Sequence, residues 1–150
     1  MRAVIQRVKK ASVNIENEVY SGIATGLVIL LGICEEDTME DIKWMVNKIL
    51  NMRIFSDSEG KMNYSIEEYG GGLMVISQFT LFGSTKKGNR PSFIKAAKPD
   101  IAIPLYDNFL HYLKSATLLD VVSGSFGADM NISLINQGPV TIIIDSKNKE

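Results

Sequence analysis

A polar cluster interrupts one of the most apolar stretches of the chain. Residues 73–82 read LMVISQFTLF, so Ser77, Gln78 and Thr80 follow four consecutive apolar residues. Buried hydroxyl and amide groups need hydrogen-bond partners, because an unpaired one costs on the order of 1–3 kcal/mol. Two interpretations fit this pattern: the side chains bond neighbouring backbone within an ordinary strand, or they line a site. The Gly- and Lys-containing loop that follows favours a site.

The remaining sequence offers few other kinds of chemistry. Cys34 is the only cysteine and His111 the only histidine, and neither an HExxH motif nor a Gly-rich phosphate loop occurs. The sequence therefore predicts no metal and no cofactor. A Ser-His-Asp triad would have to recruit His111 from a predicted helix, and no nucleophile-elbow motif surrounds any serine. What remains is chemistry by backbone dipoles, hydroxyl groups or the substrate itself, which suits cleavage of an activated ester.

The charge distribution offers no general attraction for nucleic acid. The net charge is −1 and the computed pI is about 5.9. Any contact with RNA must therefore be local. Lys86, Lys87 and Arg90 form the obvious candidate for phosphate contacts, although such a cluster is more often simply a solvated turn.

Length and composition predict one domain over residues 1–150, with a polar, frayed tail over residues 146–150. The hydrophobic fraction of 45% is ordinary for a globular protein, and no apolar run reaches the length of a membrane span. We therefore expect a cytoplasmic protein without membrane contact. The predicted strands are Ala3–Val8, Ser12–Ile15, Val19–Ile23, Leu27–Ile33, Arg53–Phe55, Leu73–Phe82, Thr117–Val122, Ile132–Ile135 and Val140–Ile144.

Two helices are predicted between these strands. The first begins after a cap at Asp37 or Thr38 and repeats apolar residues at helical spacing from Ile42 to Leu50. The second covers Ile101–Ser115, with its regular part beginning near Ile103 because Pro104 is tolerated only in a first turn. The continuous apolar run Leu27–Ile33 is typical of a strand covered on both faces.

Several motifs in this order resemble the D-aminoacyl-tRNA deacylase family, whose enzymes free tRNA from D-amino acids. Two core motifs carry the resemblance, SQFTL at Ser77–Leu81 and NQGPVT at Asn136–Thr141. Five further motifs support it across the whole chain: IQRV from Ile5, RIFSD from Arg53, GKMN from Gly60, RPSF from Arg90 and GADM from Gly127. Together with the predicted elements, the resemblance implies a compact α/β domain. In it, two largely antiparallel β-sheets form a barrel-like core with helices on an outer face.

The resemblance also implies a homodimer in which Gly138-Pro139, joined by a cis peptide bond, enters the partner's active site. Its two carbonyls would hold the substrate's α-ammonium and exclude an L side chain, and Arg7 would support the motif from behind. The pocket for the terminal adenosine and the aminoacyl group would be shaped by Phe79, Ala102, Phe126 and Met130.

The implied reaction is hydrolysis of the ester of D-aminoacyl-tRNA. The resemblance also implies deacylation of glycine misattached to tRNA(Ala), because glycine has no side chain to exclude. The N–H groups of Phe79 and Thr80 would stabilise the oxyanion, while a water assisted by the ribose 2′-OH attacks. In the competing mechanism Thr80 is the nucleophile. Two other readings stay open: a non-catalytic nucleic-acid-binding dimer that uses Lys86, Lys87 and Arg90, and a structural dimer whose motifs only pack.

Overall fold

The computed structural model describes residues 1–149 and is organised around the long strand β1 (Arg2–Ile15). This strand pairs antiparallel with β2 (Glu18–Ile23), β3 (Gly26–Gly32) and β8 (Asn131–Asp145). The prediction of two strands, Ala3–Val8 and Ser12–Ile15, was wrong. The exposed Lys9 and Lys10 continue one strand because a register shift against β8 between Val8 and Ala11 accommodates them.

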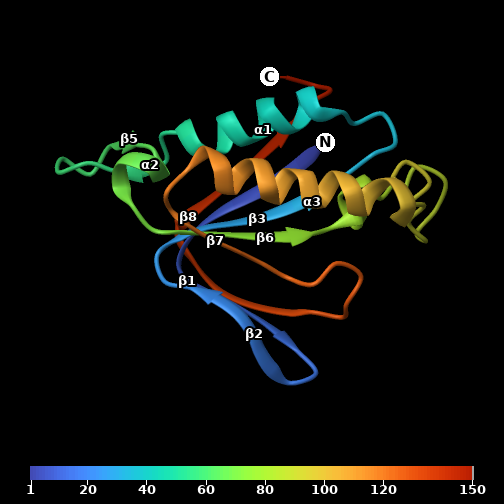
Figure 1. Ribbon diagram of the computed structural model, residues 1–150, viewed down its shortest axis with the longest axis horizontal. Helices are drawn as coiled ribbons and strands as arrows, with labels where there is room; N and C mark the ends of the chain where they lie inside the picture. The colour runs from blue at the N-terminus through green and yellow to red at the C-terminus, as the bar shows by residue number, and fades with distance from the viewer. Residues whose placement is uncertain (150) are drawn as a thin grey trace.

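The other half of the large sheet is parallel. Strand β6 (Gly72–Ser77) pairs with β3 on one side and with β7 (Asp120–Ser123) on the other. Helix α1 (Met39–Asn51) lies in the connection from β3 to β6, and α3 (Pro99–Ala116) in that from β6 to β7. Both helices lie side by side on one face of the sheet (Figure 1). This arrangement follows from parallel pairing, which needs a long crossover connection.

A second, two-stranded sheet consists of β4 (Phe55–Ser56) and β5 (Met62–Tyr64), followed by the short helix α2 (Ile66–Tyr69). The large sheet has the order β2-β1-β3-β6-β7, with β8 added to β1. Its outer strands approach each other where the Ser21 hydroxyl donates to the Ser123 carbonyl over 2.9 Å. The predicted α/β class, with largely antiparallel sheets, a barrel-like core and helices outside, is confirmed, and the parallel strands are its unexpected part.

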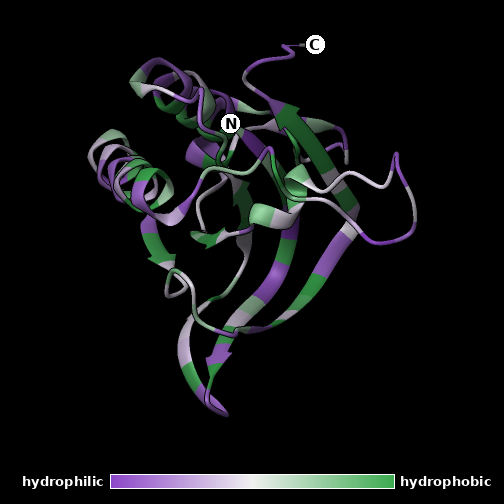
Figure 2. Ribbon diagram, turned by 90° about the vertical axis from the view of Figure 1, so that its right-hand side faces the viewer, coloured by the Kyte–Doolittle hydropathy of each residue, from purple (hydrophilic) through white to green (hydrophobic). Residues whose placement is uncertain are grey.

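Strands β3 and β6 are buried on both faces, as the apolar run predicted. Leu27, Ile29 and Leu31 pack in the core beneath the helices, whereas Val28 lies in a second core enclosed by the curved sheet. The hydrophobic stripe of α1 from Ile42 to Leu50 is buried as predicted. Alternating hydrophobic and hydrophilic bands along the helices and the longest strands mark elements that are buried on one face only (Figure 2).

The boundaries of several elements differ from the prediction. Helix α3 begins at Pro99 and contains Pro104 in its interior. The carbonyl that Pro104 leaves unpaired belongs to Asp100, which is exposed, so water can satisfy it. The predicted strands Ile132–Ile135 and Val140–Ile144 are parts of one strand, β8. Strands β4 and β7 begin two to three residues later than predicted, as expected for boundaries read from composition.

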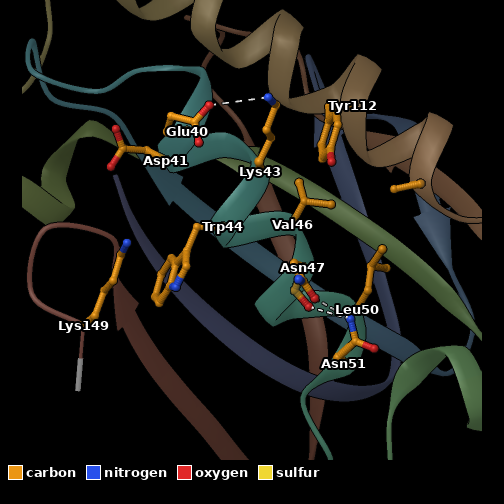
Figure 3. A pocket seen from close by; sticks show the side chains of 11 residues that line it. Glu40, Asp41, Lys43, Trp44, Val46, Asn47, Leu50, Asn51, Tyr112 and Lys149 are labelled. Atoms are coloured by element: carbon orange, nitrogen blue, oxygen red, sulfur yellow. Dashed lines mark hydrogen bonds and ion pairs between the residues drawn. The ribbon is translucent and has the colours of Figure 1, made fainter.

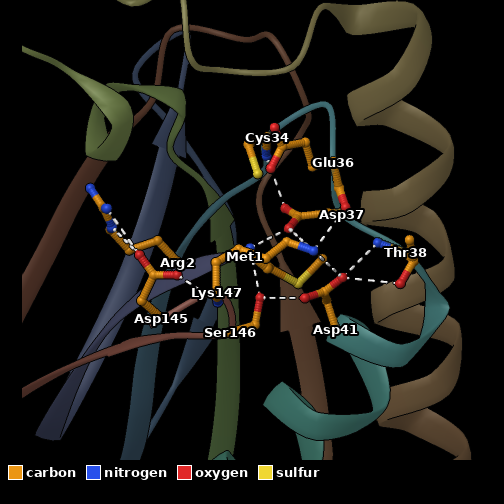
Figure 4. A network of polar contacts seen from close by, with 10 residues as sticks. All are labelled: Met1, Arg2, Cys34, Glu36, Asp37, Thr38, Asp41, Asp145, Ser146 and Lys147. Carbon is orange, nitrogen blue, oxygen red and sulfur yellow. Dashed lines mark hydrogen bonds and ion pairs between the residues drawn. The ribbon is translucent and has the colours of Figure 1, made fainter. Parts of the chain in front are cut away.

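The start of the predicted frayed tail is ordered, so that prediction was wrong for its first residues. Ser146 is buried, its N–H donates to the Met1 carbonyl over 2.8 Å, and its hydroxyl donates to Asp41 over 2.6 Å (Figure 4). Polar residues remain ordered there because a buried ionic network supplies their partners. Glu150 lies outside the described residues. Within residues 1–149, no helix is long and apolar enough to cross a membrane.

Candidate active site

A cavity of about 590 Å³ lies at the carboxyl edge of the parallel strands. Its walls come from the ends of β3 and β6, from the start of α3 and from the loop after β7. Open α/β sheets bind ligands at this edge, because the strand ends and the loops that follow them converge there. The cavity is therefore the candidate active site.

The structure brings six of the predicted site residues together around this cavity: Ser77, Gln78, Phe79, Ala102, Phe126 and Met130. Thr80 follows directly after and is exposed, and its hydroxyl accepts a hydrogen bond from the Gln78 side-chain amide. The polar cluster at the end of β6 thus faces a cavity, in agreement with the second of the two interpretations of this stretch.

The predicted strand Leu73–Phe82 was wrong in its second half. Strand β6 ends at Ser77, and Phe79–Phe82 form a short 3-10 helix, η1, across the end of β3. The Gln78 N–H donates to the Leu31 carbonyl over 2.8 Å and turns the chain. Gly32 allows this crossing, because a Cβ there would lie 3.1 Å from the Gln78 carbonyl oxygen.

The turn into η1 leaves two backbone amides free. Within residues 1–149, the N–H groups of Phe79 and Thr80 donate no hydrogen bond, as expected for the first residues of a helix. The Phe79 side chain is 57% exposed beside the cavity, and its ring meets the edge of Phe93 at a centroid distance of 5.2 Å. Two free amides at a cavity rim can stabilise a negatively charged oxygen.

Tyr106 is a contributor that the sequence did not indicate. Its hydroxyl donates to the Val75 carbonyl over 2.9 Å, and its ring packs 5.6 Å from that of Phe126. Burial raises the pKa of Tyr106, so the hydroxyl stays protonated as a donor. The Gly124 N–H donates to the same carbonyl over 3.1 Å, which ties the loop after β7 to the sheet. Tyr106 therefore fixes the wall of the cavity that carries Phe126.

Gly138 and Pro139 do not line this cavity among the residues that the structure describes. They lie exposed in a wide bulge of β8, where four residues (137–140) stand opposite Arg7 alone. Their peptide bond is cis, and the φ of Gly138 is +123°, which favours glycine. Asn136, which the sequence also did not single out, closes the bulge by accepting the Val140 N–H over 3.0 Å.

Arg7 lies directly behind the bulge. Its side chain is buried, its Nε donates to the Gln137 carbonyl over 3.2 Å, and its Nη1 donates to the Ile54 carbonyl. No carboxylate within residues 1–149 forms an ion pair with it. A buried guanidinium without such a partner is costly. Because Arg7 instead bonds to two backbone carbonyls, one of them in the bulge, we infer that it holds the backbone of the bulge in place.

The three predicted phosphate ligands lie on a basic loop, residues 84–92. Ser84 and Ser92 close it by exchanging two backbone hydrogen bonds of 2.9 Å. Lys86, Lys87 and Arg90 are all exposed on it. The loop follows η1 and leads into Phe93 at the cavity, so its charges are accessible near the rim.

A second cavity, of about 550 Å³, lies between α1 and α3, and none of the predicted site residues lines it. Trp44 is half-buried there beside Lys149, whose ammonium lies 5.2 Å from the indole centroid (Figure 3). His111 is exposed on α3 and has no place in the candidate active site.

The fold and the position of the cavity define an α/β protein with a ligand site at the carboxyl edge of its parallel strands. The chain belongs to the D-Tyr-tRNA(Tyr) deacylase family, whose model matches residues 4–145. It is 59% identical to a D-aminoacyl-tRNA deacylase of Bacteroides fragilis and 57% identical to one of Bacteroides thetaiotaomicron, each over 100% of both chains. The family predicted from the sequence motifs is thereby confirmed.

A solved structure, named c-Myc DNA Unwinding Element Binding Protein, has the same fold. It superimposes with a TM-score of 0.92 at 40% identity and covers 97% of this chain and 98% of its own. The barrel-like sheet and the outer helices are therefore a shared architecture, on which the site residues determine what each protein does.

Proposed function

We propose that the protein hydrolyses the ester bond of D-aminoacyl-tRNA and releases the D-amino acid and the tRNA, as an enzyme of the cytoplasm. Its membership of the deacylase family supports the substrate class. The single structural observation behind the chemistry is the pair of free amides from Phe79, which lines the cavity, and from Thr80, the next residue. Ester hydrolysis passes through a tetrahedral oxyanion, which two such donors stabilise.

In the proposed mechanism the protein supplies binding and electrostatics. The ester carbonyl oxygen lies at the amides of Phe79 and Thr80, and a water assisted by the substrate's 2′-OH attacks the carbonyl carbon. The alternative, in which Thr80 is the nucleophile, lacks support because the Thr80 hydroxyl bonds to the Gln78 amide, which cannot accept its proton. No metal or cofactor enters these steps.

The proposed chiral selection requires a second copy of the chain. Gly138 and Pro139 are exposed on β8 and do not line the cavity of their own chain, which supports a role for them at the site of a partner. Exposed apolar side chains favour such a dimer: Ile143 on the same strand is 67% exposed and Phe79 is 57% exposed. In the dimer, the two residues hold the α-ammonium and exclude an L side chain.

The same exclusion leaves glycine acceptable, so we include glycine mischarged on tRNA(Ala) among the substrates. The terminal adenosine and the aminoacyl group are assigned to the wall formed by Ala102, Phe126 and Met130. Lys86, Lys87 and Arg90 of the basic loop are assigned to the tRNA phosphates.

The test compares chelator-treated protein on D-Tyr-tRNA and L-Tyr-tRNA. We expect the D ester to be hydrolysed far faster than the L ester, with the same rates before and after chelation. The Thr80→Ala variant should keep most single-turnover activity, because only the Thr80 backbone takes part. Loss of activity to background with intact folding would instead establish Thr80 as the nucleophile. Hydrolysis of neither ester by the wild-type protein would overturn the proposal.

The second candidate function is binding of nucleic acid without catalysis. The exposed cations of the basic loop favour it, as does the name of the solved structure with the same fold, a DNA-binding protein. This candidate predicts binding of uncharged tRNA with no deacylation, so the same experiment distinguishes the two.

A further inference from the structure

One arginine outside the proposed site bonds directly to the segment that carries the free amides. The Arg2 Nη1 donates to the Leu81 carbonyl over 2.7 Å, and its guanidinium carbon lies 4.9 Å from the centre of the Phe82 ring. Both residues belong to η1, the short helix that begins with Phe79 and Thr80. Arg2 itself lies 79 residues before Leu81 in the sequence, at the start of β1.

The Arg2 side chain is itself fixed from a third element. Its Nε and Nη2 both donate to Oδ2 of Asp145, over 3.0 and 2.9 Å, at the end of β8 (Figure 4). Burial acts to raise the pKa of Asp145, but hydrogen bonds from the Lys147 N–H and from Arg2 outweigh it and lower the pKa. The carboxylate therefore stays ionised and orients the remaining guanidinium donor toward η1.

This contact is more important to η1 than to the fold as a whole. Arg2 is 37% exposed on its side chain, and an ion pair at that exposure adds little to stability. Helix η1 has only four residues, and 3-10 helices have weak hydrogen-bond geometry. Its entry is held by the bond from Gln78 to Leu31, and near its far end the Leu81 carbonyl accepts the bond from Arg2.

We propose that Arg2, oriented by Asp145, is a positioning residue that aims the amides of Phe79 and Thr80 at the oxyanion. This inference rests on the proposed function. Arg2 does not line the cavity, and it acts through the Leu81 carbonyl. Oxyanion donors act in the transition state, so their misalignment lowers kcat and leaves substrate binding unchanged.

The test replaces Arg2 by lysine, which keeps the charge but cannot bond to Asp145 and Leu81 at once. We expect kcat on D-Tyr-tRNA to fall about tenfold while KM changes less than twofold, since full loss of one oxyanion donor costs about a hundredfold or more. The Asp145→Asn variant should act in the same direction, and the double variant should lose no more than Arg2→Lys alone, because both act through one contact.

The matched control is Arg53→Lys. Arg53 also bonds to a backbone carbonyl and to a side chain, through Nε to the Asn63 carbonyl and Nη2 to the Asn63 amide oxygen, on the small sheet. It should leave kcat and KM unchanged. An increase in KM at constant kcat in Arg2→Lys, or an equal loss of kcat in the control, would overturn the proposal.

A second readout needs no activity. The amide ¹H–¹⁵N resonances of Phe79 and Thr80 should shift in Arg2→Lys and stay in place in Arg53→Lys, and unshifted resonances would also overturn the proposal. If the wild-type protein hydrolyses neither ester, the proposed function fails and takes the role in catalysis with it. The resonances then decide separately whether Arg2 holds η1.

Discussion

Replacing Arg7 by lysine tests whether the bulge of β8 selects the hand of the substrate. The Arg7 guanidinium is the buried group behind this bulge, and it bonds to the carbonyls of Gln137 and Ile54. The hypothetical Cβ of Gly138 lies 2.8 Å from Nη2, so the side chain fits closely against the motif. Lysine keeps the charge but can reach only one of the two carbonyls.

The expected magnitude follows from the bond that is lost. A hydrogen bond to a charged group contributes about 1.5–3 kcal/mol, so Arg7→Lys should lower the free energy of unfolding by about that amount. The bond to Gln137, of 3.2 Å, is longer than the bond to Ile54, of 2.5 Å, so we expect lysine to lose the bond to Gln137. The ordered form of the bulge then becomes less populated by roughly ten- to a hundredfold, at 1.4 kcal/mol per tenfold. The ratio of D-Tyr-tRNA to L-Tyr-tRNA hydrolysis should decrease by a similar factor.

Two measurements separate the effects on fold and on selection. Urea unfolding gives the stability, and parallel deacylation of the D and L esters gives the ratio. Arg53→Lys, which replaces an exposed guanidinium that bonds to the Asn63 carbonyl, is the control for both measurements. A stability loss of the expected size with an unchanged D-to-L ratio would refute the reasoning, because Arg7 would then support the fold alone.

Two further predictions concern charge. Burial acts to raise the pKa of Asp41, but hydrogen bonds from Lys147, Ser146 and Thr38 outweigh it and lower the pKa. The ionised Asp41 therefore stabilises the folded state fully at neutral pH, and this stabilisation disappears as pH falls below about 4. Asp41→Asn should therefore cost about 1–3 kcal/mol at pH 7 in urea unfolding, and a gap from the wild type that does not narrow toward pH 2 would contradict this. Neutralising the three cations of the basic loop should reduce the slope of log affinity for tRNA against log salt concentration by about 2–3 and leave kcat unchanged. An unaltered slope would show that the loop does not contact the tRNA phosphates.

Patterns contained within a single element predicted the fold well. The helical spacing from Ile42 to Leu50 reflects a helix that is buried on one face. The apolar run Leu27–Ile33 reflects a strand that is buried on both faces. The direction of strand pairing was not predictable in this way. It depends on long-range contacts, such as those between β3 and β6, and these leave no local signal beyond the apolar run.

Site residues could be predicted where they belong to a sequence motif, but not where their role depends on a contact with a distant part of the chain. Ser77 and Gln78 were singled out by their polarity after an apolar run, the family motif added Phe79, and all three line the cavity. The role of Gly138 and Pro139 stays a prediction from the second motif. Arg2 and Tyr106 were missed because each has an ordinary local sequence and acquires its role through distant backbone carbonyls, those of Leu81 and Val75. Hydrogen bonds from side chains to remote carbonyls place no requirement on the identity of the accepting residue, so they leave no pattern to find.

The two arginines of β1 connect the proposed oxyanion amides and the proposed chiral selection to the same strand. Successive side chains of a strand point to opposite faces, so Arg2 and Arg7, five positions apart, lie on opposite sides of the sheet. Arg2 bonds to η1 through Leu81, whereas Arg7 bonds to the bulge through Gln137. One strand can thus hold both functional segments in place without the segments touching each other within a chain. Because the two contacts are separate, loss of Arg2 should reduce kcat for both hands alike, whereas loss of Arg7 should change the ratio between them.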